Sequence, residues 1–588
     1  MQIMAFFIYM KRKFYLNLAF LCCALAACAQ PKFSPEVEAQ IKKVETGMRG
    51  RYFSVQGEPN WTLEERMKFY GVKGLTVAVI KDFKVEWARG YGWADSAEGR
   101  RVTPETIFEP GSISKSLNAF GIMKLVQEGK LDLNTDINQY LKTWKFPYDS
   151  VSHGKKITLK QLLSHTAGLT VHGFPGYYYG DTFPSIYQIL DGKEPANTAA
   201  VRSAFEPGLR YQYAGGGTMI SELILTDVTG MPYDKYMEEN VFKPLGMTNS
   251  FFSQPPPKDR RKQLATGYGA DGKEIKGKYP ILLEQAAGGL WTTPTDLCKF
   301  IIEVQKVWKG EKGKVLNQQT VRTMLKAVDA AEGDSVALGF FLPVFKDTRY
   351  FAHGAGNQGF RGQYYGNFYD GYGVAIFING EGFGVVPELI SSIAETYGWK
   401  DFYFAKEKAA IAVPDSIKEK YLGVYKEGET VVTVRKIKNE YTYYSGNIDA
   451  KMYFTTQTCF FNKEWATHKC FVRDSSGEYS IVRTMPDGKI LNPMRKIKTI
   501  SLPPVLIDEY TGTYWIDEAW EIVKQDGRLK FNIGNKFAEM HFFSETEFYM
   551  EEAQGEIFTF VKDKSGKMIG LNYRAGVPAT DQLAKRVK

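Results

Sequence analysis

A serine and a lysine three residues apart, Ser112 and Lys115, are the pair in this chain whose chemistry is easiest to infer. They lie in residues 111–115, just ahead of apolar residues at near-helical spacing, which predict an amphipathic helix. Residues three apart on a helix share a face, so the lysine amine can reach the serine hydroxyl and take its proton. A free hydroxyl is a weak nucleophile and needs such a base, so the pair indicates acyl transfer through a serine ester.

The same spacing occurs a second time, at Ser152 and Lys155. Those residues lie in a polar segment without an apolar stripe, and a loop does not hold two side chains at a fixed separation. The sequence context therefore favours Ser112. On this motif alone a second interpretation stays open, in which Ser112 caps a helix and Lys115 is solvated.

Three further segments carry residues that suit such a site. Tyr213 precedes a glycine-rich turn that includes Gly215, and residues 285–294 form a second glycine-rich turn that includes Trp291. His353 opens a predicted edge strand over residues 353–360. Glycines beside a strand let the backbone of a substrate approach closely, so these segments are candidates for the walls of a cleft.

The elements that must position these residues read as one α+β domain over residues 34–402. Residues near 35–70 are predicted to be helical, and residues 75–80 and 85–91 to form a buried hairpin. Near the end of the domain, residues 363–367 and 372–379 read as strands joined at the turn dipeptide Asp370-Gly371, and residues 387–397 as a helix. Strands at both sequence ends, with helices between them, predict a single sheet that is completed only when the last strands of the domain join the first.

The composition changes after Trp399, and residues 403–419 are expected to be a connector. Two β-rich modules follow, over residues 420–499 and 504–588. Each opens on a Tyr-x-Gly-x-Tyr motif, at 421–425 and 510–514, which indicates a duplicated all-β unit. Whether each unit is a barrel or a sandwich is left open by the sequence.

Residues 1–29 are predicted to be an export signal, because a basic region at 11–13 precedes the apolar segment 16–27. Two cleavage sites fit: a lipobox ending at Cys28, whose lipidation would attach the protein to a membrane, and a small-x-small site before Gln30. We therefore expect an exported, periplasmic protein. In an oxidising compartment Cys459 and Cys470 could close a hairpin, whereas Cys298 is expected to be buried.

Composition excludes several other classes of function. The net charge of +9 is mild for 588 residues, and no long basic run indicates a nucleic acid partner. No spacing of His, Cys and Asp residues indicates a metal site, and we expect no cofactor. The expected partner is a small-molecule or peptide substrate.

Taken together, the segments at Ser112, at residues 162–169, at Tyr213 and at His353 resemble the serine β-lactamase and penicillin-binding superfamily, in its class C and D-aminopeptidase/esterase branch. The resemblance covers roughly residues 35–400. It implies a β-lactamase/transpeptidase-like fold, an antiparallel sheet flanked by helices plus a helical subdomain.

The resemblance also implies a role for each matching residue. Ser112 would be the acylated nucleophile, Lys115 its base, and Tyr213 would share proton transfer to the leaving group. His353 would take the first position of the Lys-Thr-Gly strand motif, and the N–H groups of Ser112 and Gly356 would form the oxyanion hole. The residues expected to bind the substrate are Gly215, Gly354, Ala355, Trp291 and Tyr177.

Two departures from the family pattern affect the expected substrate. Gly215 replaces an asparagine whose amide helps to bind an acylamido group, and His353 replaces a lysine. A histidine with an ordinary pKa is mostly neutral at pH 7, so it helps a substrate carboxylate less than a lysine does. We therefore expect an esterase or peptidase acting on ester, peptide or amide bonds. The alternatives are a true class C β-lactamase or D,D-carboxypeptidase, and an inactive binding or scaffold protein.

Other residues support less specific interpretations. His165 is expected to hold a loop by hydrogen bonds. Tyr177, in the aromatic segment 174–179, would line the cleft or belong to a surface loop, and Trp291 would wall the pocket or fill the core.

Overall fold

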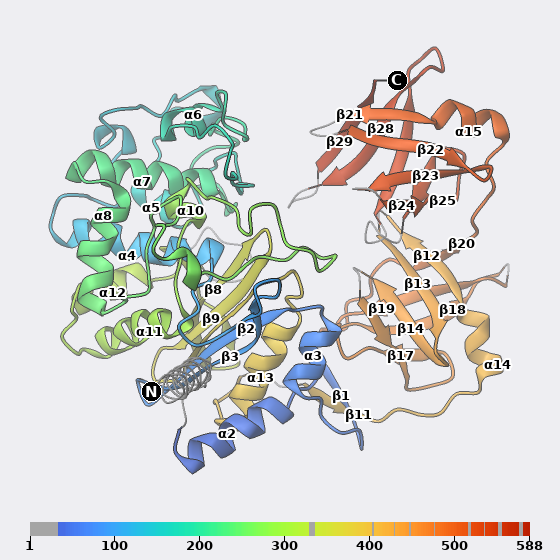
Figure 1. The fold of residues 1–588 in the computed structure, drawn as a ribbon, viewed down its shortest axis with the longest axis horizontal. Coiled ribbons are helices and arrows are strands. Elements are labelled where there is room, and N and C mark those ends of the chain that lie inside the picture. The colour runs from blue at the N-terminus through green and yellow to red at the C-terminus, as the bar shows by residue number, and fades with distance from the viewer. Residues whose placement is uncertain are drawn as a thin grey trace, which may run out of the picture. The chain divides into compact units, whose positions relative to one another are not determined.

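The computed structural model describes residues 33–328, 336–402, 405–428, 430–445, 448–475, 477–515, 519–533, 536–550, 556–575 and 580–587. The segment predicted to be an export signal, residues 1–29 with Cys28, lies outside the described residues. The chain divides into two compact units, one made of Met1–Met48 with Asn60–Tyr403 and the other of Arg49–Pro59 with Phe404–Lys588 (Figure 1). Within the described ranges, every helix is too short or too polar to cross a membrane.

The first unit is built on a mainly antiparallel sheet in which the first strands of the unit lie beside the last. The predicted hairpin β2–β3 forms, and β10 pairs with β2 so that Ala375 lies opposite Ala78. The turn at Asp370-Gly371 joins β9 to β10 as predicted. In spatial order the strands are β4 (Arg100–Arg101), β3 (Lys84–Asp95), β2 (Gly74–Lys81), β10 (Gly373–Ile378), β9 (Phe360–Asn367), β8 (Thr348–Asn357), β6 (Phe340–Phe341) and β5 (Val336–Ala337), with β7 (Val344–Phe345) beside β8.

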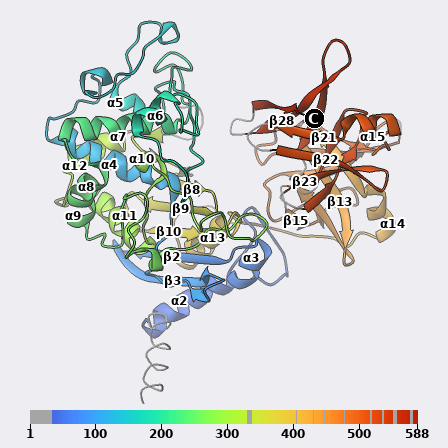
Figure 2. The ribbon, with the colours of Figure 1, turned by 45° about the horizontal axis from the view of Figure 1, so that its top comes forward.

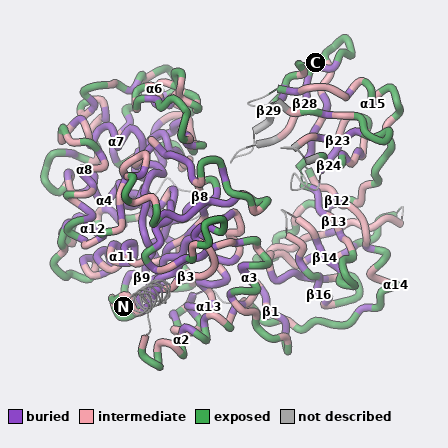
Figure 3. Tube along the Cα trace, in the orientation of Figure 1, coloured by how far each residue is buried: buried purple, intermediate pink, exposed green. Residues whose placement is uncertain are grey.

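Helices cover both faces of this sheet, because the central strands are apolar on both sides. Val77 and Val79 of β2 face a layer formed by α2 (Pro35–Thr46), α3 (Leu63–Phe69) and α13 (Val385–Thr396). Ala78 and Ile80 face the larger core, which includes α11 (Pro294–Lys309). Figure 2 shows α2 on one side of the sheet and α4 and α7 on the other, and Figure 3 shows the strands between them as buried.

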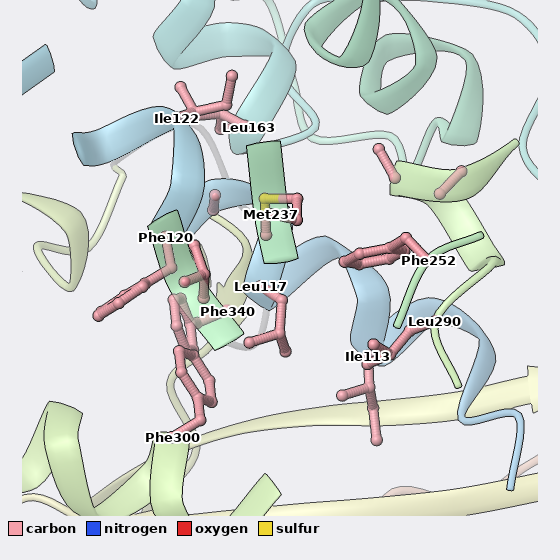
Figure 4. Packing of buried hydrophobic residues seen from close by; sticks show 14 of the residues in the cluster. Ile113, Leu117, Phe120, Ile122, Leu163, Met237, Phe252, Leu290, Phe300 and Phe340 are labelled. Atoms are coloured by element: carbon pink, nitrogen blue, oxygen red, sulfur yellow. The ribbon is translucent and has the colours of Figure 1, made fainter. Parts of the chain in front are cut away.

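The helix α4 (Ser114–Gln127) runs through the larger core and carries Lys115. Its residues from Ser114 to Met123 are all buried, so the helix is enclosed on every side rather than amphipathic as predicted. Figure 4 shows its side chains interleaved with those of neighbouring elements; the labelled residues are Ile113, Leu117, Phe120, Ile122, Leu163, Met237, Phe252, Leu290, Phe300 and Phe340. A close-packed surrounding of this kind resists displacement, which fixes the position of the helix start.

The other helices of the helical part complete this enclosure. They are α5 (Leu159–Leu163), α6 (Ile186–Asp191), α7 (Gly215–Thr229), α8 (Tyr233–Met237), α9 (Lys243–Leu245), α10 (Gln285–Gly288) and α12 (Gln318–Met324). The helix predicted near residues 35–70 is two helices instead, because residues 49–59 leave the first unit. Met48 and Trp61 bond each other's backbones where the chain leaves and returns, with N–O distances of 3.1 and 2.9 Å.

Residues 49–59, which the sequence alone assigns to the first domain, lie with the second unit. There β1 (Phe53–Val55) pairs in parallel with β11 (Lys406–Lys408), within the expected connector. Phe53 and Val55 pack with Phe461 in a small apolar cluster, which accounts for the departure of this segment from the first unit.

The second unit holds two modules with the same topology. In each, the first strand pairs with the last and consecutive strands pair along the chain, except at one step in the middle (β15 to β16, and β24 to β25), so both modules are barrel-like. The first comprises β12 (Gly423–Glu427), β13 (Thr430–Ile437), β14 (Glu440–Ser445), β15 (Ile448–Lys451), β16 (Tyr453–Phe454), β17 (Cys459–Phe461), β18 (His468–Arg473), β19 (Tyr479–Thr484) and β20 (Met494–Ile497). The second comprises β21 (Gly512–Trp515), β22 (Ala519–Gln525), β23 (Arg528–Ile533), β24 (Lys536–Glu539), β25 (His541–Phe542), β26 (Glu547–Tyr549), β27 (Ile557–Lys562), β28 (Met568–Ala575) and β29 (Thr580–Arg586).

The paired tyrosine motifs have the same role in both modules. Tyr425 donates its hydroxyl to the carbonyl of Tyr421 at 2.7 Å, and Tyr514 donates to Tyr510 at 2.8 Å. Short helices precede them, α14 (Asp415–Lys418) and α15 (Pro504–Tyr510). The prediction of an α+β domain followed by two all-β modules is therefore confirmed.

The three cysteines in the described part of the chain agree with the expectations from the sequence. Cys459 and Cys470 lie opposite each other on β17 and β18 and are joined by a disulfide. Cys298 is a buried free thiol on α11.

Candidate active site

Ser112 lies in a 3-10 turn, η1 (Gly111–Ile113), that leads directly into α4. The hydroxyl of Ser114 ties this turn down, since it donates to the carbonyl of Gly111 at 2.6 Å and accepts from the N–H of Leu290 at 3.1 Å. Gly111 has a φ of +47°, in the left-handed region that favours glycine. The turn therefore sets Ser112 at a fixed position at the start of a buried helix.

The amine of Lys115 meets the hydroxyl of Ser112. Its Nζ lies 3.0 Å from Oγ of Ser112 and donates to the carbonyl of Ala287 at 2.6 Å. Burial lowers the pKa of Lys115 to about 7, because the charged ammonium is poorly solvated there. An appreciable fraction of this amine is therefore neutral near pH 7 and able to accept a proton.

Tyr213 completes the group around the serine. Burial raises the pKa of Tyr213, and a hydrogen bond with Ser112 opposes that effect. The Nζ of Lys115 lies 5.0 Å from the centre of the tyrosine ring. The phenol therefore stays protonated at neutral pH and acts as a hydrogen-bond donor that can relay a proton.

Two histidines hold Tyr213 in place. The ring of His165 lies 4.3 Å from the ring of Tyr213, and its Nδ1 accepts the N–H of Ala214 at 3.2 Å. Burial and the nearby Lys115 lower the pKa of His165, so its ring is neutral. Nδ1 of His172 lies 2.5 Å from the carbonyl oxygen of Tyr213. The expectation that His165 holds a loop by hydrogen bonds agrees with this geometry.

His353 lies on β8, facing the same group of residues. Its ring is 6.4 Å from that of Tyr213 and 5.1 Å from that of Phe341, and Nδ1 lies 2.8 Å from the carbonyl of Gly354. Burial and the charge of Lys115 lower the pKa of His353 to about 3. The imidazole is thus neutral at physiological pH, as the sequence argument supposed, though for the stronger reason of desolvation.

The strand β8 offers an open edge beyond Ala352, where its pairing with β6 ends. Asn357 pairs with Phe360 across a two-residue turn, and hydrogen-bonded pairs alternate along an antiparallel ladder. Gly354 and Gly356 consequently direct their N–H groups away from β9. A Cβ on Gly111 would come 3.1 Å from the nitrogen of Gly356, so that N–H lies beside the serine turn.

Three residues predicted to bind substrate are not brought to this group as expected. Trp291 is fully buried and packs on Tyr279 and Phe360, while Ala355 is buried in the same core. Tyr177 is 3% exposed, and its hydroxyl accepts the N–H of Asn197. The side chains of Trp291 and Ala355 belong to the larger core, and the side chain of Tyr177 is buried as well.

Gly215 starts α7 at a position where a side chain would be tightly packed. A Cβ there would lie 3.0 Å from the ring of Phe174 and 3.1 Å from the carbonyl of His172. The second serine–lysine pair is not formed: the hydroxyl of Ser152 donates to the carbonyl of Asp149 at 2.7 Å, and Lys155 pairs with Glu206.

Sequence reasoning missed the contacts that three residues make at this site. The carbonyl of Ala287 holds the amine of Lys115, His172 holds the backbone of Tyr213, and Asn357 follows the oxyanion glycine. Every residue has a backbone carbonyl, so the residue type of Ala287 does not predict its contact with Lys115. The glycine-rich character of residues 285–294 was the one sequence signal near it. Among the described residues no three His, Cys, Asp or Glu side chains are grouped as a metal site.

The arrangement is suited to nucleophilic catalysis at a carbonyl. A serine hydroxyl, an amine that is partly neutral and a protonated phenol converge, next to backbone N–H groups on an open strand edge. An activated hydroxyl with adjacent N–H donors is the combination that acyl transfer requires.

Known proteins resemble this chain in part of its sequence and in fold. A family model described as Beta-lactamase matches residues 61–397, more than half of the chain. Protein flp of Staphylococcus aureus (strain N315) is 27% identical over 285 residues, which is 46% of this chain and 52% of that protein. The chain thus spans about half the length of the curated relatives it matches.

A solved structure resembles most of the chain. It is an octameric penicillin-binding protein homologue from Pyrococcus abyssi, with a TM-score of 0.52 and 21% identity. The match covers 74% of this chain and 97% of that one. At this identity the likeness concerns the fold.

Proposed function

Because the chain belongs to the beta-lactamase family, we propose that it is a serine hydrolase working through an acyl-enzyme on Ser112. Its substrates in this proposal are esters, peptides or amides. The observation that carries the proposal is the 3.0 Å separation between Nζ of Lys115 and Oγ of Ser112, with the ring of Tyr213 5.0 Å from the same amine.

In the acylation step, the neutral amine of Lys115 takes the proton of Ser112 as Oγ bonds to the substrate carbonyl carbon. The carbonyl electron pair moves to oxygen, and the N–H groups of Ser112 and Gly356 stabilise that oxyanion. Each such donor typically accounts for roughly 100- to 1000-fold in rate. The carbonyl of Ala287 holds the amine in line throughout.

Collapse of this intermediate breaks the bond to the leaving group. The departing alkoxide or amine needs a proton, and the phenol of Tyr213 donates it, with replacement from the ammonium of Lys115. Water then attacks the serine ester, and the same groups accept and return its proton. The acid is released and Ser112 regains its hydroxyl.

The site electrostatics favour an esterase or peptidase over an efficient β-lactamase. A His353 with a pKa lowered to about 3 carries no charge at neutral pH, so it gives a substrate carboxylate no ionic partner. Position 215 carries no amide side chain, and a Cβ there would lie 3.0 Å from the ring of Phe174, so an asparagine would require that ring to move. A true β-lactamase or D,D-carboxypeptidase is the competing assignment.

We also propose that the protein is exported to the periplasm, with Cys28 as a candidate lipid anchor, on the strength of the N-terminal sequence alone. Membrane fractionation of the wild-type chain and of Cys28→Ser tests the anchor. Equal membrane association of both would contradict it.

The test of the catalytic proposal is labelling by a fluorophosphonate, read as intact-protein mass. The wild-type chain should gain one adduct, Ser112→Ala should gain none, and Ser152→Ala should label as the wild type does. An unlabelled wild type overturns the proposal and favours an inactive binding protein, and an adduct that persists in Ser112→Ala overturns it by placing the reactive group on another residue. Turnover of nitrocefin beside p-nitrophenyl esters separates the two enzyme assignments.

A further inference from the structure

Asn357, which the proposed mechanism does not use, lies where three catalytic segments meet. It is the last residue of β8 and directly follows Gly356. Its backbone carbonyl accepts a hydrogen bond from the guanidinium of Arg361, which fixes the end of the strand. Because side chains alternate along a strand, the side chain of Asn357 lies on the same face of β8 as that of Ala355.

The first contact of this side chain is with the nucleophile turn. Gly111, the residue before Ser112, lies so close that a Cβ would be 3.0 Å from Oδ1 and 3.1 Å from the side-chain carbon of Asn357. The same Cβ would be 3.1 Å from the nitrogen of Gly356. The amide group of Asn357 and the oxyanion strand are therefore both pressed against the turn that carries the nucleophile.

The second contact is with the segment that holds the base. Nδ2 of Asn357 donates to the carbonyl of Gly288 at 3.2 Å. Gly288 follows Ala287, whose carbonyl accepts Nζ of Lys115 at 2.6 Å. The side-chain amide of Asn357 thus bonds Gly288, the residue directly after the one whose carbonyl holds the amine of Lys115.

We propose that Asn357 is a positioning residue that sets the mutual geometry of the Ser112 hydroxyl, the Lys115 amine and the Gly356 N–H. This inference rests on the proposed function. Its physical basis is that a site of this kind needs its reacting groups held to a fraction of an ångström, and a misplacement of about 1 Å can reduce the rate roughly 100-fold. From the end of β8, which carries Gly356, the side chain of Asn357 contacts both the turn that carries Ser112 and the segment whose carbonyl holds Lys115.

The experiment measures kcat and KM for a p-nitrophenyl ester across pH 5.5–9, in Asn357→Ala and in the isosteric Asn357→Asp. Both should lose roughly 10- to 100-fold in kcat with KM changed less than threefold, since the lost geometry concerns the reacting groups. The rising limb of the pH profile should move to higher pH, because a loosened Ala287 carbonyl admits water to Lys115 and raises its pKa.

The matched control is Asn138→Ala. Asn138 is also half-buried and donates its amide to a backbone carbonyl, that of Phe146 at 3.0 Å, away from the site. It should keep the wild-type kcat and pH profile. If Asn357→Ala does not fold, Asn357→Asp, which preserves the shape, provides the measurement.

Wild-type kcat and an unshifted pH profile in a folded Asn357 variant would overturn the inference, as would a loss confined to KM. The failure of the proposed function is distinguishable, because it appears as an unlabelled wild type or a Ser112→Ala variant that retains turnover.

Discussion

The hydroxyl oxygen of Ser112 and the amine of Lys115 are 3.0 Å apart at the start of a helix that is buried along most of its length. The carbonyl of Ala287 holds the amine from the other side. In this geometry the hydroxyl of Ser112 is the proton donor within reach of the amine. Burial lowers the pKa of the amine, and this makes Lys115 able to accept that proton near neutral pH.

The pH dependence of turnover should follow the lowered pKa of Lys115, about 7. The neutral amine is the active form, so the rate should rise as pH increases through 7 and level off above it. Lys115→Arg should lose roughly 100- to 10,000-fold in kcat, because a guanidinium stays protonated and cannot act as a base. Steady-state kinetics over pH 5–9 provide the check, and Lys155→Ala should behave as the wild type.

A substitution of Gly111 should damage the site more than an equivalent change elsewhere. Both Gly111 and Gly129 have a positive φ, but a Cβ on Gly129 meets nothing within 4 Å, whereas on Gly111 it meets Asn357. Gly129→Ala should cost about 1–2 kcal/mol of stability, the usual penalty of the left-handed region, and leave kcat unchanged.

Gly111→Ala should carry the same penalty and also lose at least roughly 10-fold in kcat, since the added methyl displaces the nucleophile turn. Denaturant unfolding and ester hydrolysis, measured side by side on both variants, separate strain from misplacement. Equal kcat values in the two variants would show that the turn tolerates displacement.

Buried carboxyls should make the first unit less stable as the pH rises from 5 to 7. Burial raises the pKa values of Glu222 and Glu284 to about 8, whereas unfolding returns them towards 4.5. Between these values the folded chain binds more protons than the unfolded chain, so the free energy of unfolding falls as pH increases.

Glu222→Gln keeps an acceptor for the N–H of Ala286 but does not titrate. The stability advantage of this variant over the wild type should therefore grow by about 1.4 kcal/mol per pH unit across this range. Chemical denaturation at pH 5, 6 and 7 measures it, with the exposed Glu105→Gln as control. A constant difference between Glu222→Gln and wild type would contradict the argument.

The disulfide should stabilise the first β module without affecting catalysis. It closes a loop with a sequence separation of 11, and such a closure contributes on the order of 2–3 kcal/mol. The double variant Cys459→Ser/Cys470→Ser should lower only the unfolding transition of the second unit, while ester hydrolysis at Ser112 stays at the wild-type rate. Calorimetry with intact and variant chains tests this, and a shift of the first unit's transition would argue against it.

Much of the fold was predictable because its elements have local signatures. The hairpin of β2 and β3, the turn at Asp370-Gly371 and the paired tyrosine motifs of the β modules all follow from alternation and turn chemistry in short windows. The departure of residues 49–59 had no such signature. Phe53 packs with Tyr453 and Phe461, which lie 453 − 53 = 400 and 461 − 53 = 408 positions later in the chain, and a local sequence pattern does not predict a contact over such a separation.

For the site as well, the contacts that depend on local spacing were predictable and those that depend on long-range packing were not. The spacing of Ser112 and Lys115 is local and predicted their contact, whereas the sequence left two interpretations open for Trp291, the pocket wall or the core, and two for Tyr177, the cleft or a surface loop. Aromatic side chains serve cores and clefts equally well, and both of these are buried in the structure. The carbonyl of Ala287 belongs to the backbone, and the side chain of Asn357 meets Gly111 and Gly288 only in the folded chain, so residue types alone predict neither contact.

The most direct test of the central claim is rapid-quench mass spectrometry during turnover of a p-nitrophenyl ester. We expect a transient acyl group, one per chain, on the peptide that contains Ser112, formed at the rate of the p-nitrophenol burst and absent from Ser112→Ala. Turnover at the wild-type rate with no acylated peptide at any time, or with the acyl group on a different peptide, would contradict the account.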